Sequence, residues 1–175
     1  SLPVGWKSLE VHDAYCEYDL NDGEKVSIEI REFRLQPGTR VSLAGSSGSG
    51  KTTVLHMLMN LVEFRGRYEL DGESIRDTYI APSSIALVTA ADGFFPISIR
   101  DNLTLGRSVT DSELRRILQG LQIDFIANMD EKFGERIAFS AGQLQRLRLA
   151  RGLLTNAKVL LLDEPFTGVD ETNKG

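Results

Sequence analysis

The segment at residues 45–52, GSSGSGKT, constrains the fold more than any other part of the chain. It matches the phosphate-binding pattern G-x-x-x-x-G-K-[ST] without a mismatch. Residues 40–44 alternate and include β-formers, which predicts a strand, and the residues after the segment place Val54, Leu55 and Leu58 at helical spacing. Strand, glycine-rich loop and helix form the context that the pattern requires. We therefore predict a nucleoside triphosphate site rather than a Gly/Ser-rich turn that happens to end in Lys-Thr.

Each residue type in this loop has its own chemical role. Gly45, Gly48 and Gly50 permit a close backbone approach, so that successive N–H groups point at phosphate oxygens from the positive end of the following helix. Lys51 is expected to neutralise the β and γ phosphates, and the Thr52 hydroxyl to coordinate the Mg²⁺ that bridges them. The predicted nucleotide-binding residues of the loop are Gly45, Ser46, Ser47, Gly48, Ser49, Gly50, Lys51, Thr52 and Thr53.

A second element ends in two carboxylates. Residues 159–162, VLLL, are four apolar residues typical of a buried parallel strand, and Asp163 and Glu164 follow directly. Ligands bind at the carboxyl ends of strands in open α/β sheets, so we predict that Asp163 holds Mg²⁺ and that Glu164 accepts a proton from the attacking water. Alone, Asp-Glu after a strand could simply cap the next helix. Beside an intact phosphate loop, Glu164 and Lys51 are the predicted catalytic residues.

Composition limits the partners. The formal net charge of the 175-residue chain is -5, which argues against a nucleic-acid partner, and Arg146, Arg148 and Arg151 are expected to form a solvated helix face with local ion pairs. Cys16 is the single cysteine, so no internal disulfide is possible, and no Cys/His cluster has zinc spacing. No apolar run is long enough to span a bilayer. A cytoplasmic setting is expected.

Local patterns give the order of the elements. Alternation predicts strands at residues 9–11 and 26–30, and a strand with its turn at 66–72. A short apolar run predicts a buried strand at 85–88. The capping box at residues 110–113 opens a helix. The apolar stripe of that helix consists of Leu114, Ile117, Leu118 and Leu121.

These elements predict an α/β fold in one domain of residues 1–175. Its expected parts are an antiparallel β region (1–44), the P-loop and core (45–89), a helical subdomain (97–152) and the acidic strand with its loop (153–175). The fold class is a P-loop NTPase core with an antiparallel β subdomain and an inserted α-helical subdomain, truncated at the C-terminus.

The helix that precedes the acidic strand carries a further motif. Residues 139–143, FSAGQ, contain a capping box in Ser140 and Gln143, and an amphipathic helix follows over 144–154. This segment resembles the Leu-Ser-Gly-Gly-Gln signature of the ATP-binding cassette (ABC) ATPases, and the resemblance covers essentially the whole chain. In that family the helix start faces the γ-phosphate bound to the opposite subunit. The resemblance therefore implies a second ABC domain, head to tail, with Ser140, Gly142 and Gln143 contacting its ATP.

The resemblance extends to other segments. Tyr18 stands where the family places an aromatic residue on adenine, although Tyr15 is close by and core packing is the usual fate of such a tyrosine. Residues 167–170 resemble the D-loop, which contacts the other subunit. Residues 97–103 and 132–136 resemble segments of exporter-type members that lie against the coupling helices of the membrane domain. The implied function is ATP- and Mg²⁺-dependent export at the cytoplasmic face of a membrane, with a transmembrane domain in the same full-length chain.

Three features depart from the family pattern. Ala90 replaces a glutamine that reaches Mg²⁺ and the attacking water, Ala141 replaces the first signature glycine, and no switch histidine follows the D-loop before Gly175. The chain also lacks an initiator methionine, so we expect an excised fragment that hydrolyses ATP weakly or not at all. Two alternatives stay open. One is a degenerate module that binds ATP and leaves catalysis to a partner, and the other is a soluble ABC ATPase without a membrane domain.

Overall fold

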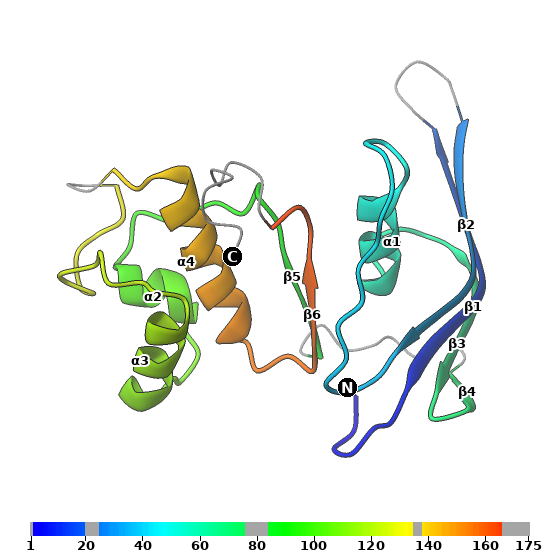
Figure 1. Ribbon diagram of the computed structural model, residues 1–175, viewed down its shortest axis with the longest axis horizontal. Helices are drawn as coiled ribbons and strands as arrows, with labels where there is room; N and C mark the ends of the chain where they lie inside the picture. The colour runs from blue at the N-terminus through cyan, green and yellow to red at the C-terminus, as the bar shows by residue number, and fades with distance from the viewer. Residues whose placement is uncertain (1, 20–24, 76–83, 135–137, 166–175) are drawn as a thin grey trace. The chain divides into compact units, whose positions relative to one another are not determined.

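The computed structural model describes residues 2–19, 25–75, 84–134 and 138–165. The chain forms two compact units, Ser1–Ile85 and Ala86–Gly175 (Figure 1). Strands and helices occur in both units, which confirms the predicted α/β class. Among the described residues, no helix combines the length and the apolar character that crossing a membrane requires.

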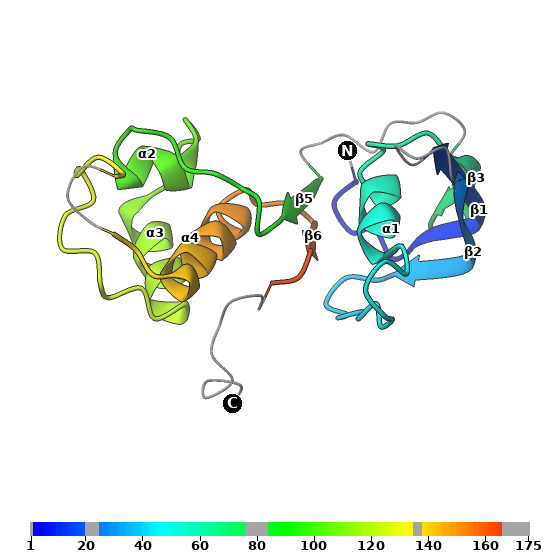
Figure 2. The ribbon, with the colours of Figure 1, turned by 90° about the horizontal axis from the view of Figure 1, so that it is seen from above.

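The first unit is built on an antiparallel sheet with the strand order β2-β1-β3-β4. Its elements are β1 (Leu9–Asp19), β2 (Lys25–Leu35), α1 (Lys51–Leu58), β3 (Arg65–Leu70) and β4 (Glu73–Ile75). Helix α1 lies against one face of the sheet (Figure 2). Leu9 and Val11 of β1 are buried on that face, where Tyr68 of β3, the partner of Val11, donates its hydroxyl to the Met57 carbonyl of α1 at 2.8 Å.

A bulge in β1 explains one glycine of the sheet in steric terms. The register of β1 against β3 shifts between His12 and Tyr15, where Asp13 adopts a φ of 48°. Gly66 of β3 faces this point, and a Cβ there would lie 2.8 Å from the Ala14 Cα. Only glycine allows the two backbones to approach so closely.

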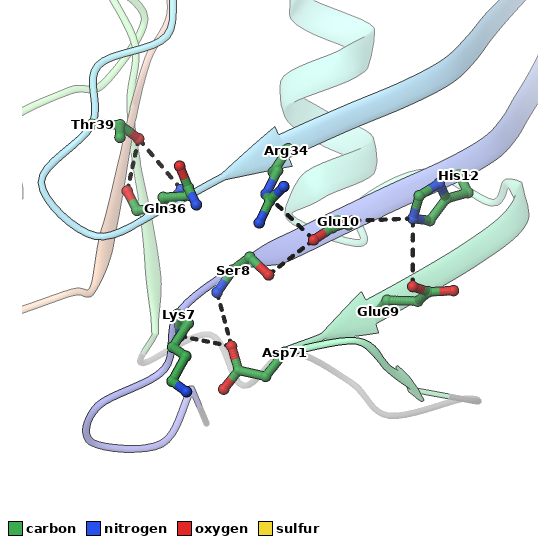
Figure 3. Close-up of polar contacts among 9 residues, drawn as sticks. All are labelled: Lys7, Ser8, Glu10, His12, Arg34, Gln36, Thr39, Glu69 and Asp71. Atoms are coloured by element: carbon green, nitrogen blue, oxygen red, sulfur yellow. Dashed lines mark hydrogen bonds and ion pairs between the residues drawn. The ribbon is translucent and has the colours of Figure 1, made fainter.

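Asp71 fastens the segment before β1 to the turn between β3 and β4. Its Oδ1 accepts hydrogen bonds from the backbone N–H groups of Lys7 at 2.6 Å and Ser8 at 2.8 Å (Figure 3). These bonds, that of Ser8 foremost, lower the pKa of the Asp71 carboxyl, because they stabilise its ionised form. The turn therefore holds the entry of β1 in place as long as Asp71 is ionised.

The strand predicted at residues 40–44 is absent. The chain there belongs to no sheet, and Val41 is exposed. A strand needs a hydrogen-bonded neighbour, and the edge strands of this sheet, β2 and β4, do not pair with residues 40–44. The prediction of a strand over residues 40–44 was therefore wrong.

Within its described residues, the second unit has a two-stranded sheet and three helices. They are β5 (Ile85–Val88), α2 (Ile99–Thr104), α3 (Asp111–Gly120), α4 (Ala141–Leu153) and β6 (Val159–Leu162). Both strands begin and end where the apolar runs predicted. Helix α4 packs closely on the sheet through Gly152, where a Cβ would lie 2.5 Å from the Val88 Cγ2 and 3.1 Å from the Leu160 Cδ1.

A core of aliphatic side chains joins the three helices. Thr110 caps α3 by accepting a hydrogen bond from the Glu113 N–H at 3.2 Å, as the capping pattern predicted. The apolar stripe of α3 is confirmed, with Leu114 buried and Leu118 packed at the edge of the core. The buried members of this core are Ile99, Leu103, Leu114, Ile117, Ile123, Leu147, Ala150 and Leu154.

The prediction that the arginines of α4 form a solvated face with local ion pairs was wrong. Arg146 donates to the Gln122 carbonyl at 2.8 Å, and Arg148 donates to the Asp92 carbonyl at 2.7 Å. The Arg151 guanidinium lies 4.4 Å from the ring centroid of Phe94 and also donates to the carbonyls of Gly93 in the loop after β5 and of Asn102 in α2. A planar guanidinium satisfies loop carbonyls and stacks on rings at once, and these contacts replace the ion pairs expected from charge alone.

Asn102 of α2 organises the loop that precedes the helix. This side chain is fully buried, and its Oδ1 accepts a hydrogen bond from the Phe95 N–H at 2.8 Å. Its Nδ2 donates to the carbonyls of Phe95 at 2.9 Å, Ser98 at 3.1 Å and Ile97 at 3.2 Å. One amide therefore fixes the path of the chain over residues 95–98.

Replacing this amide should destabilise the protein markedly. Asn102→Ala is expected to lower the free energy of unfolding by about 2–3 kcal/mol, because it leaves several buried backbone groups without partners. Urea denaturation followed by circular dichroism measures this loss. Asn128→Ala is the matched control, since Asn128 is exposed and makes a single capping bond to the Asp130 N–H. Equal losses in the two variants would contradict the role given to Asn102.

Candidate nucleotide site

The phosphate loop has the backbone conformation that its glycines allow. Gly48 has a φ of 76° and Gly50 a φ of 87°, both in the left-handed region. A Cβ at Gly50 would overlap the Cδ1 of Ile28 on β2, so a larger residue would have to displace the end of that side chain and also adopt the left-handed φ. A Cβ at Gly45 would lie 2.5 Å from the Ser49 Oγ. Side chains at these positions would fill or distort the loop, which fits a phosphate cradle.

Helix α1 begins at this loop with an uncompensated positive end. Gly50 is its N-cap and provides no side-chain cap, and no acidic residue lies in the first turn of α1, every residue of which is described. The turn before it closes with the Ser49 N–H donating to the Ser46 carbonyl at 3.2 Å. A helix start of this kind favours an anion.

Lys51 places its ammonium group over the loop. Its Nζ donates to the Ser46 carbonyl at 2.8 Å and to the Gly45 carbonyl at 3.1 Å. Thr52 and Thr53 follow in the first turn of α1, where Thr52 is exposed. The loop, its lysine and its hydroxyl thus lie together in the first unit, and they have the donor set that a triphosphate with Mg²⁺ needs.

The carboxylates predicted after β6 lie beside the end of β5. The Asp163 N–H donates to the Val88 carbonyl at 2.9 Å, which continues the pairing of the two strands. Asp163 is half-buried, and Glu164 is exposed with a φ of 47°. Ala90, which is exposed, lies two residues beyond Val88. The four apolar residues of β6 are less buried than predicted, since Leu162 is exposed and only Leu161 is fully buried. A sheet of two strands has too few neighbours to bury every side chain.

The signature-like segment forms the capped start of α4. The Ser140 Oγ accepts from the Gln143 N–H at 3.2 Å, and the Gln143 Oε1 accepts from the Ser140 N–H at 2.9 Å. This confirms the predicted capping box. Ala141 is exposed, and a Cβ at Gly142 would meet nothing within 4 Å. The packing of the domain itself therefore does not explain a glycine at position 142.

Several predicted site residues fall outside what the structure describes. Tyr18 lies in β1 opposite Val26, but its side chain is not among the described ones, and residues 167–170 are not described either. Tyr15 is exposed and donates its hydroxyl to the Glu17 Oε2 at 2.7 Å. Residues 45–53 belong to the first unit, and the residues around Ser140 and Asp163 to the second. The structure shows contacts within each of these groups.

Residues 97–98 and 132–133, which belong to the two exporter-like segments, lie side by side in the second unit. Ser98 forms a β-bridge with Lys132, and the Phe133 N–H donates to the Ile97 carbonyl at 2.9 Å. The sequence analysis did not predict this pairing, and it missed the role of Asn102. The available signal for Asn102 was its position three residues after Ile99 and next to Leu103, where helical spacing places it beside the apolar residues of α2. Residues 135 and 136 are outside the described part.

The phosphate loop, the acidic strand end and the capped helix define an ATP-binding domain of the P-loop class. A family model described as "ABC transporter" matches residues 28–167. The chain belongs to the ABC transporter family. This result confirms the resemblance seen in the sequence.

Known relatives include both exporters and importers. The chain is 33% identical to the "ATP-dependent lipid A-core flippase" of Desulfotalea psychrophila, over 97% of the chain and 31% of the relative. It is 32% identical to a "Multidrug resistance ABC transporter ATP-binding and permease protein" of Lactococcus lactis, over 99% of the chain and 31% of the relative. It is 34% identical to the "Fe(3+) ions import ATP-binding protein FbpC 1" of Haemophilus influenzae, over 85% of the chain and 46% of the relative.

A solved structure supports the fold assignment. The "Structure of a bacterial Atm1-family ABC exporter with ATP bound" matches with a TM-score of 0.80 and 28% identity, over 98% of this chain and 31% of that chain. The chain therefore spans less than half of the length of each of these four proteins.

Proposed function

We propose that this chain binds and hydrolyses ATP for an exporter-type ABC transporter, and that ATP drives it together with a second ABC domain. The observation that carries the proposal is the phosphate loop, in which Lys51 lies over the uncapped start of α1. The loop combines backbone N–H donors, a helix dipole and a fixed ammonium group.

Each predicted site residue has a role in this proposal. The backbone of residues 45–53 and Lys51 bind the phosphates, Thr52 and Asp163 hold Mg²⁺, and Tyr18 stacks on adenine. The Mg²⁺, when bound, neutralises charge on the β and γ phosphates. Glu164 accepts the proton of the attacking water. Tyr15 is the weaker candidate for adenine because its hydroxyl is engaged by Glu17.

The exposed start of α4 supports the proposed dimer. Ser140 accepts one hydrogen bond from Gln143, and a hydroxyl in that state can still donate. Gly142 has open space around it, so its lack of a side chain is explained by an approach from outside the domain. In the proposed dimer, Ser140, Gly142 and Gln143 contact the ATP held by the partner domain.

Two observations favour an exporter over an importer. The flippase, the multidrug relative of Lactococcus lactis and the Atm1-family exporter structure match 97%, 99% and 98% of the chain. The exporter-like segments also pair through Ser98 and Lys132, next to Phe95, which is 56% exposed. We propose this region as the contact with a transmembrane domain, at the cytoplasmic face of the membrane.

A degenerate ATP-binding module is the second candidate. Ala90 lies just past the end of β5, whose last residue bonds to Asp163, and a methyl group there can neither bind Mg²⁺ nor orient water. Ala141 adds a methyl group at the start of α4. Under this alternative, ATP closes the dimer and the partner domain performs the hydrolysis.

Sedimentation velocity tests the shared part of both candidates. The chain carrying Glu164→Gln is expected to sediment as a monomer without nucleotide and as a dimer with ATP and Mg²⁺. Adding Ser140→Glu should abolish the dimer and leave binding of a fluorescent ATP analogue unchanged, because the new carboxylate repels the partner's phosphates. A monomer at saturating ATP would contradict the proposed dimer, and absence of ATP binding would contradict the proposal as a whole.

A further inference from the structure

An imidazole and two carboxylates converge on the face of the first sheet that α1 does not cover. Glu10 and His12 alternate with the buried Leu9 and Val11 along β1, so they point to the opposite face. Glu69 of β3 is the direct cross-strand partner of Glu10. Figure 3 shows the three side chains turned toward one another.

The distances within this cluster are short, and one nitrogen has no hydrogen-bond partner. The His12 Nε2 lies 3.5 Å from the Glu10 Oε2 and 3.6 Å from the Glu69 Oε2. This nitrogen is buried and forms no hydrogen bond. The three side chains as a whole are 17–23% exposed. Buried polar atoms in native proteins are almost always satisfied, so this nitrogen calls for a ligand.

Neighbouring side chains hold the other carboxylate oxygens. The Glu10 Oε1 accepts a hydrogen bond from the Ser8 Oγ at 2.9 Å and pairs with the Arg34 Nε at 3.4 Å. The Glu69 Oε1 pairs with the Arg67 Nε at 3.0 Å. Each carboxylate is thereby oriented with its Oε2 toward His12, as outer contacts orient the ligands of metal sites.

We propose that Glu10, His12 and Glu69 bind a divalent transition-metal ion of the Zn²⁺ type. Bonds of about 2.0–2.2 Å in a tetrahedral site separate neighbouring ligand atoms by roughly 3.3–3.6 Å, which matches both distances from the His12 Nε2. All three ligand atoms lie within 4.8 Å of one another, so the two oxygens would have to approach each other by at most about 1.5 Å to reach this spacing. A water molecule would be the fourth ligand of such a tetrahedral site.

The ligand set selects against Mg²⁺. An imidazole suits Zn²⁺ and its neighbours in the first transition row, whereas Mg²⁺ takes oxygen ligands in an octahedral arrangement. The two carboxylates balance the charge of the ion, while Arg34 and Arg67 reduce the local negative charge. We therefore expect micromolar rather than nanomolar affinity. None of the three residues belongs to the nucleotide site, so binding should not depend on ATP, and the proposal stands apart from the proposed function.

Binding would fasten β1 to β3. A ligand that binds only the folded protein stabilises it in proportion to its concentration over its dissociation constant. The site therefore couples zinc concentration to the stability of the sheet on which α1 and its phosphate loop rest. The three ligands do not form a zinc-binding motif in the sequence, because the pairing of β1 with β3 brings Glu69 beside Glu10 and His12.

Zinc titration of the chain tests the proposal without nucleotide. Isothermal titration with zinc chloride should show one site, and magnesium chloride at the same concentrations should show none there. In long-range ¹⁵N spectra, which contain signals from only two imidazoles, zinc should shift the Nε2 of His12 and leave His56 unchanged. His12→Gln and Glu69→Gln should each raise the dissociation constant at least tenfold, and His56→Gln is the matched control. Circular dichroism establishes that each variant is folded.

The contrary results are equally specific. A wild-type chain that takes up no zinc at 100-fold excess over the expected micromolar range (on the order of 100 μM) would overturn the proposal. Zinc binding that survives both His12→Gln and Glu69→Gln would overturn it too. An Nε2 that stays protonated and unshifted in zinc would show instead that the imidazolium itself bridges the two carboxylates.

Discussion

The Glu164→Gln protein is expected to bind Mg-ATP as the unchanged protein does and to hydrolyse it about 10³-fold more slowly, since loss of a general base typically costs between 10² and 10⁴. Glu164 follows β6 directly, is exposed, and lies next to Asp163, which bonds to the end of β5. An amide of the same shape cannot accept the proton of the attacking water. Binding does not depend on that step, so the two properties should separate.

Steady-state phosphate release by the complete native polypeptide measures the effect. Glu29→Gln is the control, because Glu29 is exposed on β2 and this substitution removes the same charge at a distant position in the sequence. Full turnover in Glu164→Gln would remove Glu164 from the catalytic role. Tight ATP binding without turnover in the unchanged polypeptide would favour the degenerate module, with Ala90 as its cause.

The Lys51→Ala protein is expected to lose ATP affinity by roughly 10²–10⁴-fold. Lys51 would make charge-assisted hydrogen bonds to two phosphates, and two such bonds contribute about 3–6 kcal/mol. Without ligand, its Nζ bonds only to the exposed loop carbonyls of Gly45 and Ser46, so its removal should hardly change the stability of the fold. Binding of a fluorescent ATP analogue measures the affinity, and thermal unfolding the stability.

Lys158→Ala is the control for charge, because Lys158 is exposed just before β6. Its affinity for ATP should equal that of the unchanged protein. Similar losses of binding in Lys51→Ala and Glu164→Gln would contradict the division of roles between the two residues. Unchanged affinity in Lys51→Ala would remove the lysine from the phosphate site.

Patterns that depend on neighbours in the sequence predicted their elements well. The apolar runs gave both ends of β5 and β6, and the capping box of Ser140 and Gln143 gave the start of α4. These signals are local, because a cap satisfies N–H groups within one turn and a short apolar run has definite ends. The phosphate loop was predictable for the same reason, since its glycines and its lysine act within eight residues.

Features that depend on pairing were not predictable in this way. Residues 40–44 carry a strand pattern but pair with none of the strands in the sheet of the first unit. Arg148 and Arg151 read as a charged surface, yet they contact the loop after β5 through carbonyls and the ring of Phe94. The cluster of Glu69 with His12 arises from the register of two strands. Sequence spacing carries no direct record of any of these contacts.

The tight packing at Gly152 limits how α4 can lie on the two strands beneath it. The helix has 13 residues, so it extends for about 20 Å from its capped start at Ser140 to the place where it rests on Val88 and Leu160. Because no gap remains there, a larger side chain at position 152 would displace Val88 of β5 or Leu160 of β6. The small size of residue 152 thus sets how closely α4 can approach the two strands that lead to Ala90 and Asp163.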